Sequence, residues 1–328
     1  MPLELIYNPE SDRAVYLRQP LRIDGHGYDI SVGTSAGRRQ LFDSEKPNED
    51  AFGVVSYEHG ITAAVFDGAS SQKPIPELDG ISGARFASHS LKEMFEARNG
   101  GEEVSEMLQA LNQLFGEKLK TFTSVDYTDL NSLPTSTATI AQIDTQQNRL
   151  NISHVGDSFV AVLRANGTTE LLTDNRHRPY DEEVLTLIRR IADETGATNL
   201  EARKDPRVDE AIMAMFQNTR NRPDGTGEGM LNGDPNMNQY IYPVSIPLSG
   251  ERVSAIQAVL LGSDGLVPPD MDEQNPEHRE RMFDILRYGG IKALIKRTRS
   301  AEHDDPDRRH VRYKHADDAT GILLSIVH

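Results

Sequence analysis

The stretch Ile61-Thr62-Ala63-Ala64-Val65-Phe66-Asp67-Gly68 is an apolar run that ends in an Asp-Gly pair. A second apolar run, residues 53–57, precedes it, and the turn residues Glu58-His59-Gly60 separate the two, so that together they predict a β-hairpin. The same pattern returns at Ala258-Val259-Leu260-Leu261-Gly262-Ser263-Asp264-Gly265. We therefore expect acidic residues at the ends of buried strands.

The rest of the chain alternates between helical and strand periodicity. Apolar residues three and four positions apart predict helices at 81–97, 104–122, 181–192, 208–216, 278–287 and 291–297. Short apolar runs between turn residues predict strands at 138–143, 149–155, 159–164, 170–173, 254–263 and 319–327, the first four as an antiparallel meander. This order is typical of an α+β fold with helices packed on sheets. Because no linker divides the chain, we expect a single domain over residues 1–328.

Two segments depart from this periodicity. Residues 218–238 are rich in Gly, Asn, Asp and Pro and predict a long irregular loop, a type of segment that is often functional. Residues 299–315 are almost wholly charged, and we expect them to be solvated.

Composition excludes several classes of function. The 328 residues include 35 Lys and Arg against 51 Asp and Glu, a net charge of −16 that disfavours binding to nucleic acid or to anionic membranes. The chain has no cysteine, which excludes disulfides, thiolate metal sites and a cysteinyl-phosphate mechanism. The N-terminus lacks the pattern of a secretory signal, and no apolar stretch approaches the roughly 18 residues of a membrane span. We expect a soluble, cytoplasmic protein.

Acidic clusters recur where apolar strands begin or end. Asp67 and Asp264 follow strands, whereas Glu49-Asp50 and Asp317-Asp318 precede them. Carboxylates brought together repel each other and need cations between them, and oxygen ligands of this kind suit Mg²⁺ or Mn²⁺. Two such ions can activate a water and polarise a phosphoryl oxygen. For any one of these motifs, an ordinary turn or a solvated acidic pair is the alternative.

Six short motifs then occur in a fixed order. They are Asn48-Glu49-Asp50-Ala51, Val65-Phe66-Asp67-Gly68, Thr135-Ser136-Thr137-Ala138, Val155-Gly156-Asp157-Ser158, Gly262-Ser263-Asp264-Gly265-Leu266 and Asp317-Asp318-Ala319-Thr320. Each motif is weak alone, but the series resembles the metal-dependent serine/threonine protein phosphatases, the type 2C or PPM family. The resemblance runs from about residue 48 to the C-terminus.

The resemblance implies a fold and an activity. The fold would be a central antiparallel β-sandwich flanked by helices on both sides, with the metals at one edge between the sheets. The activity would be hydrolysis of phosphoserine and phosphothreonine in a protein substrate by a hydroxide that bridges two Mn²⁺ or Mg²⁺ ions. The choice of metal, the substrate protein and the oligomeric state stay open at this point.

The resemblance also implies a ligand set. Asp67 matches the carboxylate that bridges both ions, and the Gly68 carbonyl contributes to one of them. Asp264 and Asp317 match the ligands of the other ion, and Asp50 matches an acid that contacts a metal or its bound water. Asp50 and Asp67 are therefore the candidate catalytic residues. Asp157 matches a position that holds a turn.

Several positions depart from the family pattern. Ala69 stands where many relatives carry a histidine that is discussed as a general acid. The proton for the leaving group would then come from a metal-bound water or from another histidine, for which His154 and His59 are candidates. Glu45 stands where relatives commonly carry a phosphate-binding arginine, which leaves Lys46 or one of the upstream arginines, Arg38 or Arg39, for that role.

Two further expectations concern the third ion and the substrate. Asp129 and Asp270 are displaced from the positions that hold a third metal ion in several relatives, which argues against such a site. The segment from about 175 to 240 falls where the family places a variable flap, and we expect it to cover the catalytic cleft and set substrate choice. The missing histidine and arginine also leave an alternative, a phosphatase-like binding module with weak or no activity.

Overall fold

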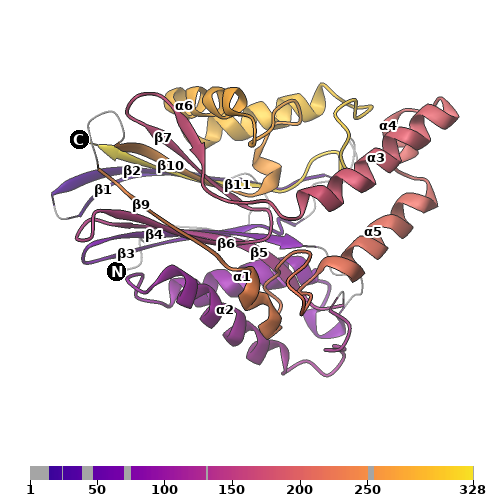
Figure 1. Cartoon of the computed structure of the whole chain (residues 1–328), viewed down its shortest axis with the longest axis horizontal. Helices are drawn as coiled ribbons and strands as arrows, with labels where there is room; N and C mark the ends of the chain where they lie inside the picture. Colours follow the sequence, from indigo (N-terminus) through magenta and orange to yellow (C-terminus); the bar gives the residue numbers. More distant parts are fainter. Residues whose placement is uncertain are drawn as a thin grey trace.

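Two antiparallel sheets stacked face to face form the centre of the molecule, and helices lie on both outer sides (Figure 1). The structure is a computed structural model that describes residues 15–23, 25–38, 47–69, 75–130, 132–249 and 255–327. The arrangement confirms the expected α+β fold with a sandwich between helices.

The first sheet contains the predicted hairpin that ends at Asp67 and Gly68. Its five strands lie in the order β3-β4-β5-β6-β9. Their bounds are Ala51–Tyr57 for β3, Gly60–Ala69 for β4, Thr135–Asp144 for β5, Arg149–Val155 for β6 and Tyr242–Pro247 for β9. Strands β3 and β4 pair antiparallel across a tight turn, as expected from the sequence.

The second sheet has six strands in the order β1-β2-β11-β10-β7-β8. Their bounds are Val15–Ile23 for β1, His26–Ser35 for β2, Ala319–Val327 for β11, Ile256–Gly262 for β10, Phe159–Arg164 for β7 and Thr169–Leu171 for β8. Strands β10 and β11, predicted from their apolar runs, pair at the centre of this sheet.

The predicted meander was wrong in one respect, because β6 and β7 belong to different sheets. The chain crosses between the sheets at Gly156-Asp157, where a meander would require a turn between paired strands. Gly156 has φ +85°, and a Cβ there would lie 2.4 Å from the Thr137 side chain. Glycine is thus required for a tight crossover, and the crossover brings Asp157 to the edge between the two sheets.

Aliphatic side chains from both sheets fill the space between them. Ile30 and Ile322 of the second sheet belong to the same buried cluster as Val65, Ile143 and Ile152 of the first. Each such side chain contributes about 1.5–3 kcal/mol when it is fully removed from water.

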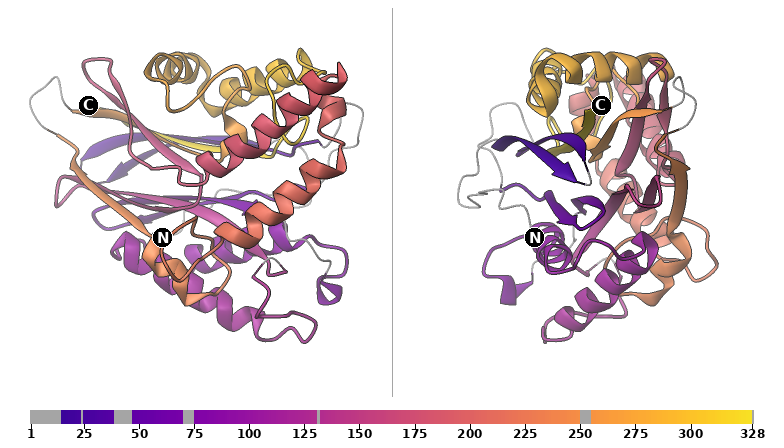
Figure 2. Two further views of the ribbon diagram at one scale, coloured as in Figure 1. Left: turned by 45° about the vertical axis from the view of Figure 1, so that its right-hand side comes forward. Right: turned by 90° about the vertical axis from the view of Figure 1, so that its left-hand side faces the viewer.

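The outer faces of the sheets are covered by amphipathic helices (Figures 1 and 2). Helices α1 (Gly83–Glu96) and α2 (Val104–Leu119) bury their apolar stripes against the first sheet, as their periodicity predicted. Helix α6 (Pro276–His303) covers the second sheet.

Helix α6 is broken at Gly290, which has φ 61° and ψ −164°, so the two separate helices predicted here are confirmed. The backbone N–H of Ile291 donates to the Ser31 hydroxyl of β2 across 3.3 Å, which caps the second half of the helix from the sheet.

Between β8 and β9 the chain leaves the sandwich and forms a helical insertion. Its helices are α3 (Arg178–Thr195), α4 (Asn199–Ala202) and α5 (Pro206–Thr219). They share a small core that includes Val184, Ile188 and Val208. An irregular segment follows up to the short 3-10 helix η2 (Pro235–Tyr240), in agreement with the predicted loop. None of the described helices combines the length and apolarity needed to cross a membrane.

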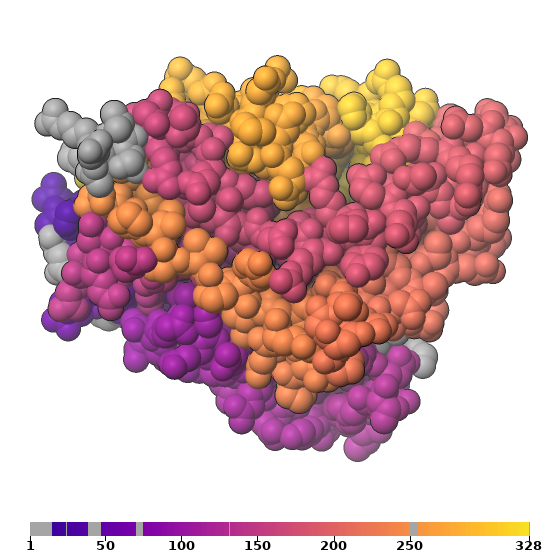
Figure 3. All heavy atoms as spheres, viewed as in Figure 1, coloured from indigo at the N-terminus to yellow at the C-terminus, as the bar shows by residue number. Residues whose placement is uncertain are grey.

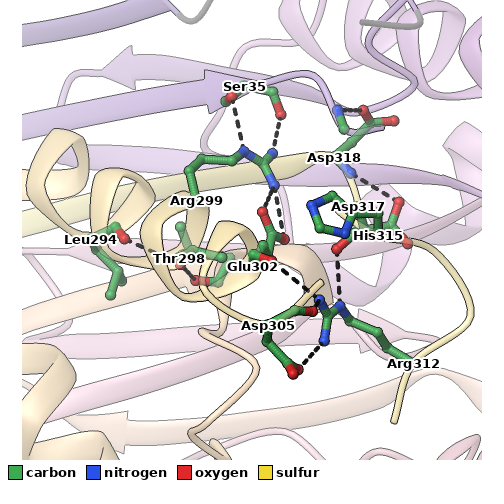
Figure 4. A network of polar contacts seen from close by, with 12 residues as sticks. Ser35, Leu294, Thr298, Arg299, Glu302, Asp305, Arg312, His315, Asp317 and Asp318 are labelled. Atoms are coloured by element: carbon green, nitrogen blue, oxygen red, sulfur yellow. Dashed lines mark hydrogen bonds and ion pairs between the residues drawn. The ribbon is translucent and has the colours of Figure 1, made fainter. Parts of the chain in front are cut away.

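The expectation for residues 299–315 was wrong in part. Helix α6 extends into this segment as far as His303, and Glu302, Asp305, Arg308 and His315 are buried. Their burial is possible because the charges are paired with one another and with backbone groups (Figure 4).

Gly290→Ala is predicted to destabilise the protein by about 2–4 kcal/mol, because its dihedral angles suit only glycine. A Cβ there would also lie 2.7 Å from the Ser31 hydroxyl oxygen. Gly167→Ala is the control, since Gly167 has φ +86° but open space around it. The control should lose only about 1 kcal/mol. Urea unfolding measures both variants, and equal losses would contradict the role given to the Ser31 contact.

Candidate active site

A pocket of about 630 Å³ opens at one edge of the sandwich, and its floor is acidic. Asp67 at the end of β4, Asp264 after β10 and Asp317 before β11 all line it. Residues that are far apart in the sequence are thus brought to one pocket. Glu49, Asp157 and Asp181 add further carboxylates to its lining.

The end of β4 is held by β5 and by a close backbone contact. The Ser136 hydroxyl donates to the Asp67 carbonyl oxygen over 2.8 Å. A Cβ on Gly68 would lie 2.4 Å from the Glu49 carbonyl oxygen and 2.6 Å from that of Ala84. Only glycine fits between these two backbone segments, so Gly68 fixes the position of Asp67 against Glu49.

Asp50 is buried beside the pocket. Its Oδ2 accepts a hydrogen bond of 2.7 Å from the Ser263 hydroxyl, whereas its Oδ1 is buried with no hydrogen-bond partner among the described residues. Burial, followed by repulsion from Asp318, raises the pKa of Asp50 to about 8.

Asp318 holds backbone and does not line the pocket. One of its oxygens accepts from the N–H of Gly37 at 2.6 Å and the other from the N–H of Glu49 at 3.0 Å.

The carboxylates of the pocket disfavour one another's ionisation. Burial, together with the neighbouring Asp50 and Asp264, raises the pKa of Asp67 well above its usual range. Loss of solvation and repulsion from Asp317 raise the pKa of Asp264 to about 8, although attraction to the Lys314 ammonium offsets part of that rise. A cation within the pocket would relieve this repulsion.

The donor set fits a hard divalent cation. It consists of carboxylate oxygens with glycine backbone beside them, and the orphaned Oδ1 atoms of Asp50 and Asp157 point to charge that the chain itself does not neutralise. At the same time, no three His, Asp or Glu side chains of the described part of the chain are already arranged to hold one ion together.

The structure brings in two residues whose roles the sequence did not indicate. Asp157, predicted only to hold a turn, lines the pocket, and His177 lies next to it. His177 has Nδ1 2.7 Å from a Glu228 oxygen and Nε2 3.0 Å from an Asp181 oxygen. Burial lowers the pKa of His177, but these two carboxylates more than offset that effect and raise it to about 11. No sequence motif marks His177, because its partners lie in α3 and in the irregular segment after α5.

The two histidines proposed from the sequence lie elsewhere. His154 accepts a hydrogen bond of 3.1 Å from the Asp174 backbone N–H and does not line this pocket. His59 lies in the β3–β4 turn, at the opposite end of β4 from Asp67. Neither is placed to protonate a leaving group at the acidic floor.

The remaining sequence candidates lie apart from the pocket or outside the described residues. Lys46 and Arg39, two of the phosphate-binding candidates, fall outside the described residues. Asp270 forms an ion pair with Arg297, and neither Asp270 nor Asp129 lines the pocket.

The insertion and the C-terminal loop form the outer wall. Leu200, Ile212, Met215 and Phe216 line the pocket from α4 and α5. The Tyr313 hydroxyl donates to Asp181 Oδ1 over 2.9 Å and ties the insertion to the loop. In the space-filling view the insertion lies directly beside the C-terminal segment (Figure 3).

Comparisons with known proteins identify a family and a fold. The sequence model of the family described as protein phosphatase 2C matches residues 37–293. Among curated proteins, no relative is similar enough to be matched.

Solved structures of the same fold share low sequence identity with this chain. The serine/threonine phosphatase Stp1 from Staphylococcus aureus has a TM-score of 0.51 and 16% identity, covering 96% of this chain and 99% of that chain. A bacterial serine phosphatase has the same score and identity, covering 91% and 97%. A sex-determining protein from C. elegans also scores 0.51 at 16% identity, covering 91% of this chain and 64% of that chain. These likenesses show the fold.

His177→Gln is predicted to destabilise the protein by about 1.5–3 kcal/mol, because buried Glu228 loses its close contact with the imidazolium and keeps only the attraction of Arg220. In a double-mutant cycle with Glu228→Gln, the combined loss should be smaller than the sum of the single losses. The pKa of His177 is higher in the folded protein than in the unfolded chain. The stabilisation of the fold by the His177 charge is therefore complete below the unfolded pKa of about 6.5. It is lost as pH rises through the folded value of about 11.

Urea unfolding at pH 6 and pH 9 measures this coupling, which should be larger at pH 6. Additive losses, or equal coupling at the two pH values, would contradict a charged His177.

Proposed function

This chain belongs to the protein phosphatase 2C family, and from that premise we propose that it is a metal-dependent phosphatase that hydrolyses phosphoserine and phosphothreonine in proteins. The observation that carries the proposal is the convergence of Asp67, Asp264 and Asp317 on one pocket from three distant segments. Such a cluster is costly to build and is expected only where cations are bound.

The proposed ligands follow from the positions of these side chains. Asp67 would contact both ions, with the Gly68 carbonyl and Asp50 on one side and Asp264 and Asp317 on the other. When bound, two Mg²⁺ or Mn²⁺ ions supply an activated water and neutralise the charge of the phosphoryl group.

The chain itself contributes orientation. Ser263 fixes the Asp50 carboxylate, and Ser136 fixes the backbone of Asp67. His177, whose two nitrogens face Glu228 and Asp181, balances carboxylate charge at the floor and does not deliver a proton. Preorganised groups of this kind lower the barrier because they need not reorient during the reaction.

We assign substrate choice to the outer wall. The apolar side chains of α4 and α5 lie at the mouth of the pocket, where they would contact the peptide on either side of the phosphorylated residue. This assignment retains the expected flap, with α3, α4 and α5 as its helical part.

Asp67→Asn and Asp264→Asn are each predicted to lower kcat about 10²–10³-fold or more on p-nitrophenyl phosphate and on phosphopeptides. The reason is the loss of a carboxylate from the proposed ion site. EDTA should abolish the activity of the wild type, and Mn²⁺ or Mg²⁺ should restore it.

Asp270→Asn is the matched control, since Asp270 pairs with Arg297 outside the pocket. It should keep wild-type activity, and circular dichroism should show that all three variants are folded. A folded wild type without metal-dependent activity would favour the alternative of a non-catalytic binding module. Substantial activity in Asp67→Asn would contradict the proposed site.

Ile212→Ala is predicted to raise KM for phosphopeptides several-fold and to leave kcat on p-nitrophenyl phosphate unchanged, because Ile212 lines the pocket from α5 and is not one of the proposed ion ligands. Met213→Ala is the control: the next residue of α5 is 42% exposed and does not line the pocket. Steady-state kinetics on both substrates measure the effect. Equal KM values for the two variants would contradict the assignment of substrate choice to the outer wall.

A further inference from the structure

Lys314 places a positive charge inside the acidic pocket. Its Nζ lies 2.6 Å from Asp317 Oδ1, and the same oxygen accepts a hydrogen bond of 2.9 Å from the Asp318 backbone N–H. The ammonium is also attracted by Asp318 and Asp264. The Lys314 side chain is about one third exposed, at 31%, and lines the pocket.

The loop that carries Lys314 is fixed on both sides of it. Arg312 donates to the carbonyl oxygens of His315 at 2.9 Å and His310 at 2.8 Å, and to Asp305 Oδ2 at 2.7 Å (Figure 4). Ala316 pairs with Arg38 through two backbone hydrogen bonds, which fix the chain just beyond Lys314. The backbone thus delivers the ammonium to the pocket, while the four-carbon stem leaves the charged end able to swing.

The position of this charge bears on ion binding. Asp317 is one of the carboxylates to which the proposed function gives a divalent ion, and it is already engaged by Lys314. An ion that binds Asp264 and Asp317 therefore either displaces the ammonium from Asp317 Oδ1 or lies beside the ammonium and is repelled by it.

We propose that Lys314 is a built-in counter-cation that competes with a divalent ion for Asp317 and so weakens ion binding at the Asp264–Asp317 side of the pocket. The inference rests on the proposed function, since it concerns the same ions. It assigns to this residue a positioning role at the metal site, in which one charge of the chain holds the ligand until an ion replaces it.

The test is the binding of Mn²⁺ to the full chain, followed by the electron paramagnetic resonance signal of free Mn²⁺, which requires no turnover. Lys314→Met removes the charge and keeps the length of the stem, and it should tighten the weaker class of Mn²⁺ sites about fivefold or more. Lys314→Arg retains the charge and should bind Mn²⁺ no more tightly than the wild type.

Lys204→Met is the matched control. Lys204 lies on the same pocket, so the change in net charge is identical, but its contacts include no ion pair with the pocket carboxylates among the described residues. Its Mn²⁺ affinity should stay within twofold of the wild type.

Wild-type affinity in Lys314→Met, or equal tightening in Lys204→Met, would overturn the inference. If Mn²⁺ binds the wild type and is lost in Asp67→Asn, such a result leaves the proposed function standing. If Mn²⁺ binds none of the variants, both the inference and the proposed function fail.

Discussion

Mutual repulsion among the carboxylates of one pocket is the constraint on which the rest of the site depends. Asp50, Asp67 and Asp264 all have raised pKa values because burial and neighbouring carboxylates disfavour their ionised forms. A fold that keeps such groups together must hold them rigidly and supply positive charge. The surrounding hydrogen bonds hold the carboxylates in place. The positive charge comes from His177, Lys314 and the proposed ions.

The sandwich makes this arrangement possible. Its two sheets are joined by an aliphatic core, so that the strand ends at one edge have fixed positions. Ser263 links Asp50 to the second sheet, and Asp318 clamps the backbones of Gly37 and Glu49. The stability of the core between the sheets thus offsets the repulsion among the carboxylates at this edge of the sandwich.

Much of this could be predicted from local patterns. The hairpin around Asp67 and the central strands β10 and β11 follow from apolar runs that are buried on both sides. Strands β1, β2 and β9 were not predicted. Strands β1 and β9 lie at sheet edges and contain prolines, which are tolerated there since an edge strand has unpaired positions. Strand β2 lies inside its sheet, but glycine and polar residues interrupt its apolar positions, so it forms no apolar run. The crossover at Gly156 was missed because a glycine turn has the same composition whether or not its strands pair.

The positions of single charged residues were harder to predict. His177 and Lys314 reach the pocket through tertiary contacts of α3 and of the loop before β11, and no spacing in the sequence encodes those contacts. The charged segment after α6 was expected to be solvated because composition cannot show that Arg312 finds Asp305. In contrast, short motifs at the beginnings and ends of strands were enough to find Asp67, Asp264 and Asp317, because the pocket lies at those same strand ends.

The central claim is that these aspartates share divalent ions, and anomalous diffraction from a crystal grown with excess Mn²⁺ tests it most directly. The account predicts anomalous peaks within the pocket, with Asp67 in contact with the ions and Asp264 and Asp317 beside one of them. A well-ordered pocket without anomalous signal, or Mn²⁺ bound only at other residues, would contradict it.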